Sequence, residues 1–281
     1  MDRAQRYERW TCRGSSPLLG TKGKEMYYVI QENTFNEKGH GRLIDGLERL
    51  KLQYEIIKVK PFVEELEFDT FRKDVFCFGG TKMSRLASNY GWKPGVVLTK
   101  NHDFMVYRNY YNENLLNYDS NVLQFSEDFP WTQGQYFIRP CKDDKSFAGQ
   151  VFDFADWHKF QHTVLEQGSD YHSQLDSKTL IQVSPVKRIQ REYRIWVVNG
   201  KIVTASQYKL GTRPFFSPQI EPDAITFAKE MVDLYQLAEA FVIDICLAND
   251  KWYVVECGCI NSAGFYEADM QRLVIAIEEA F

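Results

Sequence analysis

Apolar runs and amphipathic segments alternate between residues 26 and 98. Three of the runs have the length and composition of strands: Tyr27–Gln31, Tyr54–Val59 and Asp74–Phe78. Two segments between and after them, 42–52 and 82–90, carry apolar residues at helical spacing. This order of strand and helix predicts a Rossmann-like α/β block built on a parallel sheet.

The second half of the chain has longer apolar runs and stronger turn signals, after a mixed connection of helical fragments and loop over 100–133. Asn199-Gly200 between two apolar runs predicts a hairpin. Residues 154–167 are predicted to be a helix, and 211–219, rich in Gly, Pro and Ser, a flexible loop that can act as a lid. Two further helices are predicted from their apolar faces: Ala224, Phe227, Met231, Leu234 and Ala238 in one, and Met270, Leu273, Val274 and Ile277 in the other.

Acidic residues interrupt the last predicted hairpin, in which apolar runs 241–247 and 252–255 flank Ala-Asn-Asp-Lys. Asp244 lies within the first run and Glu256 closes the second. A carboxylate inside an apolar strand is unfavourable unless it is paired or holds a cation. Because Mg²⁺ is usually held by one or two carboxylates plus nucleotide phosphates, these acids are candidate metal ligands, with Asn261 as a further oxygen donor. The alternative is that a Lys or Arg neutralises one of the carboxylates.

The length of the hairpin loop decides whether the two acids share a face, since a shift of one residue turns every side chain to the other side of the sheet. A three-residue loop, 249–251, places Asp244 opposite Glu256. A two-residue loop, 249–250, makes the acids face opposite ways. We expect the longer loop, because Asn-Asp lacks the Gly that two-residue loops favour.

Two other segments supply cations. Arg139 ends the run Tyr-Phe-Ile-Arg-Pro, and Lys142 and Lys145 follow in a polar turn of the kind that can cradle phosphates. Further on, Glu192 and Arg194 share one face of a predicted strand, and a guanidinium can bind a phosphate or a carboxylate through a fork of N–H donors. The alternatives are a surface Arg before a turn, and a Glu–Arg surface pair that contributes little.

Composition narrows the setting. The 281 residues are 44% hydrophobic with a formal net charge of −4, which does not suggest a nucleic-acid binder. Six cysteines without a Cys-x-x-Cys pair are typical of reduced thiols in a cytoplasmic protein. No apolar run approaches the roughly 20 residues that span a bilayer. Residues 1–25 have no periodic pattern and are interpreted as an N-terminal extension or a docked arm.

The order of these segments resembles the ATP-grasp ligases over about residues 26–281. The resemblance implies an α/β fold in which a Rossmann-like pre-ATP-grasp domain (26–120) precedes an ATP-grasp domain (121–281). The ATP-grasp domain would have two lobes of α+β structure, at about 121–183 and 184–281. Arg139-Pro140 stands where most members have Lys-Pro and is similar to a phage and bacterial clade in which Arg replaces that Lys. Arg is planar and bidentate, so this replacement is not neutral.

The resemblance also implies roles for individual residues. Arg139, Lys142 and Lys145 would bind phosphates, and the backbone near Ser184 and Val186 would form a hinge that meets adenine. Arg194 would stand near the acyl phosphate as the catalytic residue, with Glu192 and Lys209 contributing to the nucleotide site. Asp244, Glu256 and Asn261 would hold Mg²⁺. The usual Glu-x-Asn ending is absent, because Gly258 occupies the Asn position and Asn261 would have to replace it.

The resulting hypothesis is an ATP- and Mg²⁺-dependent carboxylate–amine ligase that acts through an acyl phosphate. Its small-molecule substrates would be amino acids or peptides, with no membrane partner. The first alternative is an ATP-binding module of the same fold without turnover. The second is a dinucleotide-dependent enzyme that uses Gly79-Gly80.

Overall fold

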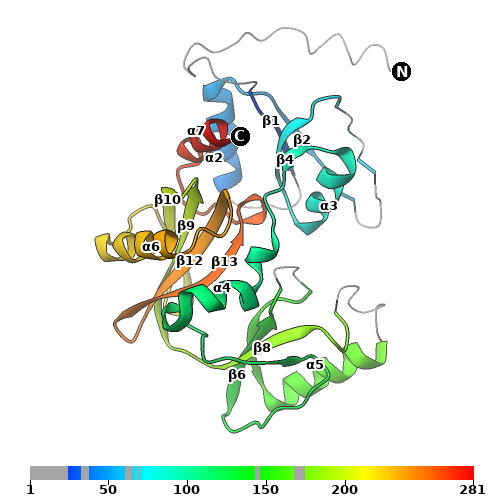
Figure 1. The fold of residues 1–281 in the computed structure, drawn as a ribbon, viewed down its shortest axis with the longest axis vertical. Coiled ribbons are helices and arrows are strands. Elements are labelled where there is room, and N and C mark those ends of the chain that lie inside the picture. The colour runs from blue at the N-terminus through cyan, green and yellow to red at the C-terminus, as the bar shows by residue number, and fades with distance from the viewer. Residues whose placement is uncertain are drawn as a thin grey trace.

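The computed structural model describes residues 25–32, 38–60, 65–66, 68, 70–142, 146–167 and 175–281. The proposed extension before residue 25 and the candidate Lys145 lie outside the described residues. Within them the chain forms three sheets with helices packed against them, which is the α/β class that the pattern predicts (Figure 1).

The N-terminal sheet is parallel, with strand order β2-β1-β3-β4. Its elements are β1 (Tyr27–Gln31), α2 (Lys38–Leu50), β2 (Tyr54–Ile57), β3 (Asp74–Phe78), α3 (Thr81–Tyr90) and β4 (Lys93–Gly95). Strands and helices occur in the predicted order. In a parallel sheet the carboxyl ends of the strands share one edge, so the segments after β1 and β3 lie side by side.

The middle sheet is antiparallel, with order β5-β8-β6-β7, and α5 packs against it over an aromatic core. Its elements are β5 (Asn121–Gln124), β6 (Gln135–Pro140), β7 (Gln150–Asp153), α5 (Phe154–Gln167) and β8 (Leu180–Pro185). The helix predicted at 154–167 is confirmed. The connection before this sheet contains α4 (Phe104–Tyr111) between two short 3₁₀ helices (Lys100–His102 and Asn112–Asn114), as the mixed pattern indicates.

The C-terminal sheet has the order β11-β10-β9-β12-β13 and is antiparallel. Its elements are β9 (Ile189–Val198), β10 (Lys201–Leu210), β11 (Arg213–Ser217), α6 (Pro222–Leu234), β12 (Ala240–Ala248), β13 (Lys251–Cys259), a 3₁₀ helix (Ile260–Ser262) and α7 (Met270–Ala280). The hairpin at Asn199-Gly200 is confirmed, with both residues at positive φ.

Two expectations for this region were wrong. Residues 213–217, predicted to be part of a flexible loop, form edge strand β11, because β10 offers them an unpaired strand edge. The apolar face predicted for α6 runs too far, since the helix ends at Leu234, whose side chain is half exposed, and Ala238 lies beyond it. The face predicted for α7 is confirmed in full.

The two faces of the C-terminal sheet have different environments. One face packs on α4 and α6 through a continuous apolar core that includes Tyr193, Ile195 and Ile243. The other face is apolar only at one end, where Trp196 and Val242 join a core with α2, α7 and the N-terminal sheet. Further along the same strands the residues on this second face are charged, beginning with Arg194 and Asp244. The candidate site therefore lies where this apolar core ends.

Candidate active site

The hairpin β12–β13 places the two predicted metal ligands opposite each other by an unexpected route. Its turn has two residues, Asn249 and Asp250, both at positive φ (51° and 59°), so the three-residue loop was wrong. A β-bulge at Val255 then adds one residue to β13, and Asp244 is directly opposite Glu256. The bulge restores the shared face that a two-residue turn alone would remove.

A second bulge lies in β10. There the register shifts between Gln207 and Lys209, so that Lys209 faces Glu192 and Tyr208 is the extra residue. Both residues contact the same carboxylate: the Tyr208 hydroxyl donates to Glu192 Oε2 at 2.7 Å, and Lys209 Nζ lies 2.6 Å from Oε1. Glu192 is buried, and the bulge gives it two partners on one side.

Arg194 and Asp244 form a buried, bidentate ion pair between neighbouring strands β9 and β12. Nε donates to Oδ1 at 2.9 Å and Nη2 donates to Oδ2 at 2.8 Å. The side chains are 13% and 3% exposed. Parallel N–H donors of this kind hold the guanidinium in one orientation.

Glu256 makes the corresponding contact across two sheets. Arg139 Nη1, at the end of β6 in the middle sheet, donates to Glu256 Oε2 on β13 in the C-terminal sheet. We call Arg139, Arg194, Asp244 and Glu256 the charge cluster. It contains four of the predicted site residues, drawn from three segments far apart in the sequence, and its formal charges cancel.

The charges of the cluster are not independent. Burial raises the pKa of Asp244, the nearby Glu256 and Glu192 carboxylates raise it further, and Arg194 acts in the opposite direction. Neighbouring carboxylates in a buried site need a cation to stay ionised together. Here the arginines fill that role, so the alternative in which a basic residue neutralises a carboxylate describes this ligand-free arrangement.

Aromatic rings surround the Arg194 guanidinium. Its Cζ lies 5.7 Å from the ring centroid of Tyr208 and 5.2 Å from that of Tyr266. Nη1 also donates to the carbonyl of Gly264 at 3.4 Å. Tyr266 has a positive φ of 50°, which is strained for a residue with a side chain. The contacts of Gly264 and Tyr266 come from the segment that crosses the sheet face between β13 and α7, and no pattern in the sequence indicated them.

Asn261 does not occupy the position predicted for a metal ligand. It is fully buried, and its Nδ2 donates to the carbonyls of Cys77 (2.6 Å) and Gly95 (3.3 Å). Its Oδ1 accepts from the Val97 N–H at 2.8 Å and lies 3.3 Å from Cys259 Sγ. The amide therefore fastens the end of β13 to the N-terminal sheet, and we leave Asn261 out of the proposed ligand set.

Gly79-Gly80 has a packing role as well. The Gly79 N–H donates to the Asn261 carbonyl at 2.8 Å and the Gly80 N–H donates to Gln31 Oε1 at 3.0 Å. A Cβ at Gly79 would lie 2.9 Å from that same Oε1. Since protein groups already use both N–H donors, this turn is not a ready-made pyrophosphate site, and the dinucleotide alternative loses its basis.

The other candidates lie apart from the charge cluster or outside the described residues. Lys142 is exposed after β6. Ser184 is buried near the end of β8, and Val186, 45% exposed, follows in the connection to β9. Lys187 in that connection is held by Asp119, with Nζ 2.6 Å from Oδ2. The segment therefore joins the two sheets as the resemblance implies, while its contact with adenine stays a prediction.

Two absences bear on the chemistry. Among the described residues, no group of three or more His, Cys, Asp or Glu side chains is arranged to hold a metal ion. Two carboxylates are nevertheless a sufficient protein contribution where phosphate oxygens complete the coordination, so the residues fit Mg²⁺ held jointly with a nucleotide. The described part of the chain also has no helix of the length and apolarity needed to cross a membrane.

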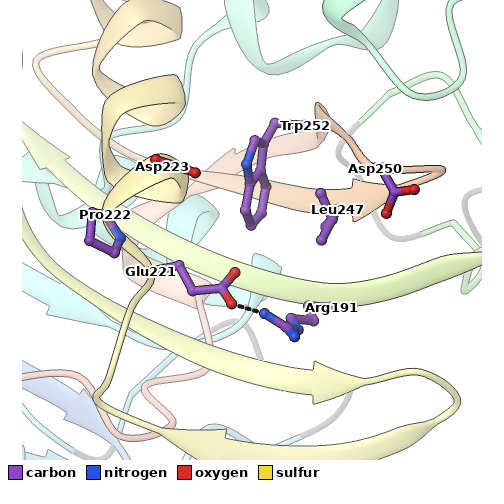
Figure 2. Close-up of a pocket in the computed structure, with 7 residues that line it drawn as sticks. All are labelled: Arg191, Glu221, Pro222, Asp223, Leu247, Asp250 and Trp252. Atoms are coloured by element: carbon purple, nitrogen blue, oxygen red, sulfur yellow. Dashed lines mark ion pairs between the residues drawn. The ribbon is translucent and has the colours of Figure 1, made fainter.

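A groove of about 540 Å³ lies on the α6 side of the C-terminal sheet, away from the charge cluster (Figure 2). Arg191 and Glu221 form an ion pair there, and Tyr193 donates its hydroxyl to Glu221 Oε2 at 3.2 Å. The remaining lining residues are Pro222, Asp223, Leu247, Asp250 and Trp252. None of the predicted site residues lines this groove.

Two lobes joined by a short connection, with a charge cluster between their sheets, define an ATP-grasp protein, and the chain belongs to that family. The model that matches is that of the ATP-grasp domain, clade family 3, and it covers residues 130–277, more than half of the 281 residues. No curated protein sequence matches the chain.

Solved structures share the fold at low sequence identity. D-alanine–D-alanine ligase from Bacillus anthracis, complexed with ATP, matches with a TM-score of 0.54 and 14% identity over 92% of this chain and 97% of that one. The ATP-grasp ligase PsnB, complexed with a minimal precursor, gives 0.55 and 12% over 92% and 99%. A RimK domain ATP-grasp protein from Sphaerobacter thermophilus gives 0.56 and 12% over 89% and 98%.

Proposed function

We propose that this protein is an ATP-dependent ligase that joins a carboxylate to an amine, with an amino acid or peptide as substrate. The observation that carries the proposal is the charge cluster, in which Asp244 and Glu256 meet Arg139 and Arg194 from two different sheets. The family supports ATP as the nucleotide. Among the structures that share the fold, D-alanine–D-alanine ligase is complexed with ATP, and PsnB is also known with Mg and ADP.

The cluster suggests how the nucleotide would be received. Asp244 and Glu256 would hold Mg²⁺, which would offset the negative charge of the phosphates. Arg139 and Arg194 would turn from the carboxylates to the phosphate oxygens, so that each charged group exchanges one partner for another. Lys142 and Lys145 would neutralise the outer phosphates, and the hinge near Ser184 and Val186 would meet the adenine.

The proposed reaction needs no protein nucleophile. An oxygen of the substrate carboxylate attacks the γ-phosphorus, and ADP leaves with the electrons of the broken P–O bond. The amine nitrogen then attacks the acyl carbon, phosphate leaves, and the nitrogen releases its proton. Arg194 is the proposed catalytic residue because its orientation is fixed by Asp244, Tyr208 and Tyr266 before any ligand binds.

The test is ADP release from Mg-ATP with pooled amino acids and dipeptides. Glu256→Gln is the informative variant, because this side chain is partly exposed (26%) and its loss should not unfold the sheet. Asp250→Asn, at the exposed turn of the same hairpin, is the matched control. We expect at least a hundredfold loss of ADP release in the first variant and none in the second. Equal rates in the two would contradict the proposal.

The second candidate is a nucleotide-binding module without turnover. It is favoured by Asn261, whose amide is committed to the N-terminal sheet and leaves the site with two carboxylates. This candidate predicts Mg-ATP binding by calorimetry without ADP release, whichever carboxylate and amine are supplied. Carboxylate-dependent ADP release would exclude it.

A further inference from the structure

Three aromatic rings continue outward from Arg194 on the charged face of the C-terminal sheet. Tyr208 and Tyr266 stack at 5.1 Å between centroids with planes 17° apart, and Tyr266 and Phe216 stack at 5.4 Å and 13°. We call Tyr208, Tyr266 and Phe216 the aromatic shelf. Its inner end contacts the guanidinium, and its outer end is on edge strand β11.

The outer ring is not packed like a core residue. Phe216 is 53% exposed, although the Tyr266 ring covers one of its faces. Aromatic side chains that serve a core are usually buried, and aromatic rings are enriched where proteins bind partners. The positive φ of Tyr266 holds the middle ring in line, and a strained conformation is retained only when its surroundings impose it.

The shelf has a usable length. Arg194 Cζ lies 5.2 Å from the Tyr266 centroid, and Phe216 lies 5.4 Å from the same centroid, so the Phe216 ring is within about 11 Å of the guanidinium. A ring stacked on the open face of Phe216 would lie roughly 5 Å further out. At about 3.3 to 3.6 Å per extended residue, this distance is spanned by two to four residues and not by one free amino acid.

We infer that the aromatic shelf binds an aromatic side chain of a peptide substrate, two to four residues from the carboxylate that reacts beside Arg194. The inference rests on the proposed ligase function and narrows its substrate class from amino acids and peptides to peptides. The strand that carries Phe216 supports this assignment, because its neighbour Phe215 is exposed to a similar degree (45%) but has no ring contact among the described residues.

The test is a ladder of N-acetylated peptides in which Phe is separated from a C-terminal Asp by zero to four Gly, with Ala in place of Phe in a matched set. Binding is measured by calorimetry in the presence of ADP and Mg²⁺, so that it does not depend on turnover. We expect tightest binding at one to three Gly and a preference for Phe over Ala of about tenfold, the factor that 1.4 kcal/mol represents.

Phe216→Ala and Phe216→Leu should abolish the Phe preference, and Phe215→Ala, the matched control, should retain it. The Leu variant keeps an apolar side chain, so a loss in both variants cannot come from unfolding of the edge strand, and thermal melts check this directly. An unchanged preference in the Phe216 variants, the same affinity at every spacing, or no peptide binding to the unmodified protein would overturn the inference.

The two proposals fail separately. ADP release with free amino acids that is the same in Phe216→Ala and Phe215→Ala would remove the shelf and leave the ligase. A Phe preference that depends on Phe216, with no ADP release for any carboxylate, would remove the ligase and leave a peptide-binding site.

Discussion

Replacement of Asp244 by Asn isolates the buried ion pair of the charge cluster. The side chain keeps its shape and one acceptor oxygen, but Arg194 loses its counter-charge and one of two hydrogen bonds, at 2.9 and 2.8 Å. Loss of a hydrogen bond to a charged group reduces stability by about 1.5 to 3 kcal/mol, and breaking a buried pair by about 3 to 5. With one hydrogen bond retained, we expect the free energy of unfolding to fall by about 3 kcal/mol.

The assay is thermal unfolding of the ligand-free protein in EDTA, so that metal binding does not contribute. For a chain of this size, a loss of 3 kcal/mol lowers the melting temperature by about 6 to 12 °C. Asp250→Asn is the control, because Asp250 is exposed at positive φ, a conformation that Asn tolerates. Its melting temperature should change by no more than about 1 °C.

A double variant separates charge from packing. Arg194→Leu combined with Asp244→Leu removes both charges and leaves apolar side chains, which is often neutral in buried pairs. We expect the double variant to be more stable than Asp244→Asn. Should Asp244→Asn melt within about 1 °C of Asp250→Asn, the buried pair does not stabilise the sheet and the reasoning is refuted.

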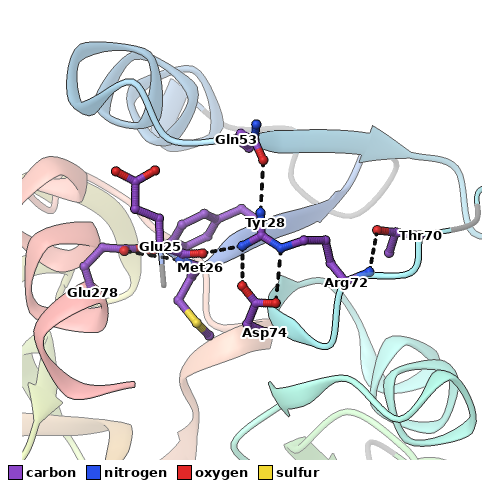
Figure 3. A network of polar contacts seen from close by, with 8 residues as sticks. All are labelled: Glu25, Met26, Tyr28, Gln53, Thr70, Arg72, Asp74 and Glu278. Carbon is purple, nitrogen blue, oxygen red and sulfur yellow. Dashed lines mark hydrogen bonds and ion pairs between the residues drawn. The ribbon is translucent and has the colours of Figure 1, made fainter. Parts of the chain in front are cut away.

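Contacts elsewhere in the molecule lead to three more predictions. Burial raises the pKa of Glu278, which accepts from the Tyr28 hydroxyl at 2.6 Å, so the folded state binds the proton more tightly than the unfolded state (Figure 3). The stability of the unmodified protein relative to Glu278→Gln should therefore decrease as the pH rises from about 4.5 through the raised pKa, and a constant difference in urea unfolding would contradict this. Gly39→Ala should lower the melting temperature, because a Cβ would lie 2.4 Å from Phe265 Cβ, whereas Gly41→Ala, with nothing within 4 Å, should stabilise α2 by about 0.5 to 1 kcal/mol; equal melting temperatures would exclude the close packing. Finally, ATP should bind about 30-fold or more tightly with Mg²⁺ than in EDTA by calorimetry, because without the metal the carboxylates of the charge cluster would lose their arginines and face the phosphates unpaired; equal affinities would show that the partners are not exchanged.

The sequence was informative wherever a local pattern determines structure. Apolar periodicity predicted α5 over its full length and the buried face of α7, and Asn199-Gly200 predicted its hairpin. Intrinsic turn chemistry and side-chain spacing act over a few residues, so they can be identified without knowledge of the fold. The same reasoning found the residues of the charge cluster one by one, because a charged residue at a strand position within or beside apolar runs is conspicuous.

The tertiary structure decided how those residues meet. A bulge at Val255 brings Asp244 opposite Glu256 despite a two-residue turn, and no local signal marks a bulge, because it arises from pairing between strands. Asn261 is a candidate ligand by sequence, yet its amide is used by the N-terminal sheet, which lies far away in the chain. Segments such as β11 and the strained Tyr266 take their conformation from an adjacent strand edge and from neighbouring rings. The sequence thus determined which side chains are available, and long-range packing determined which of them face one another.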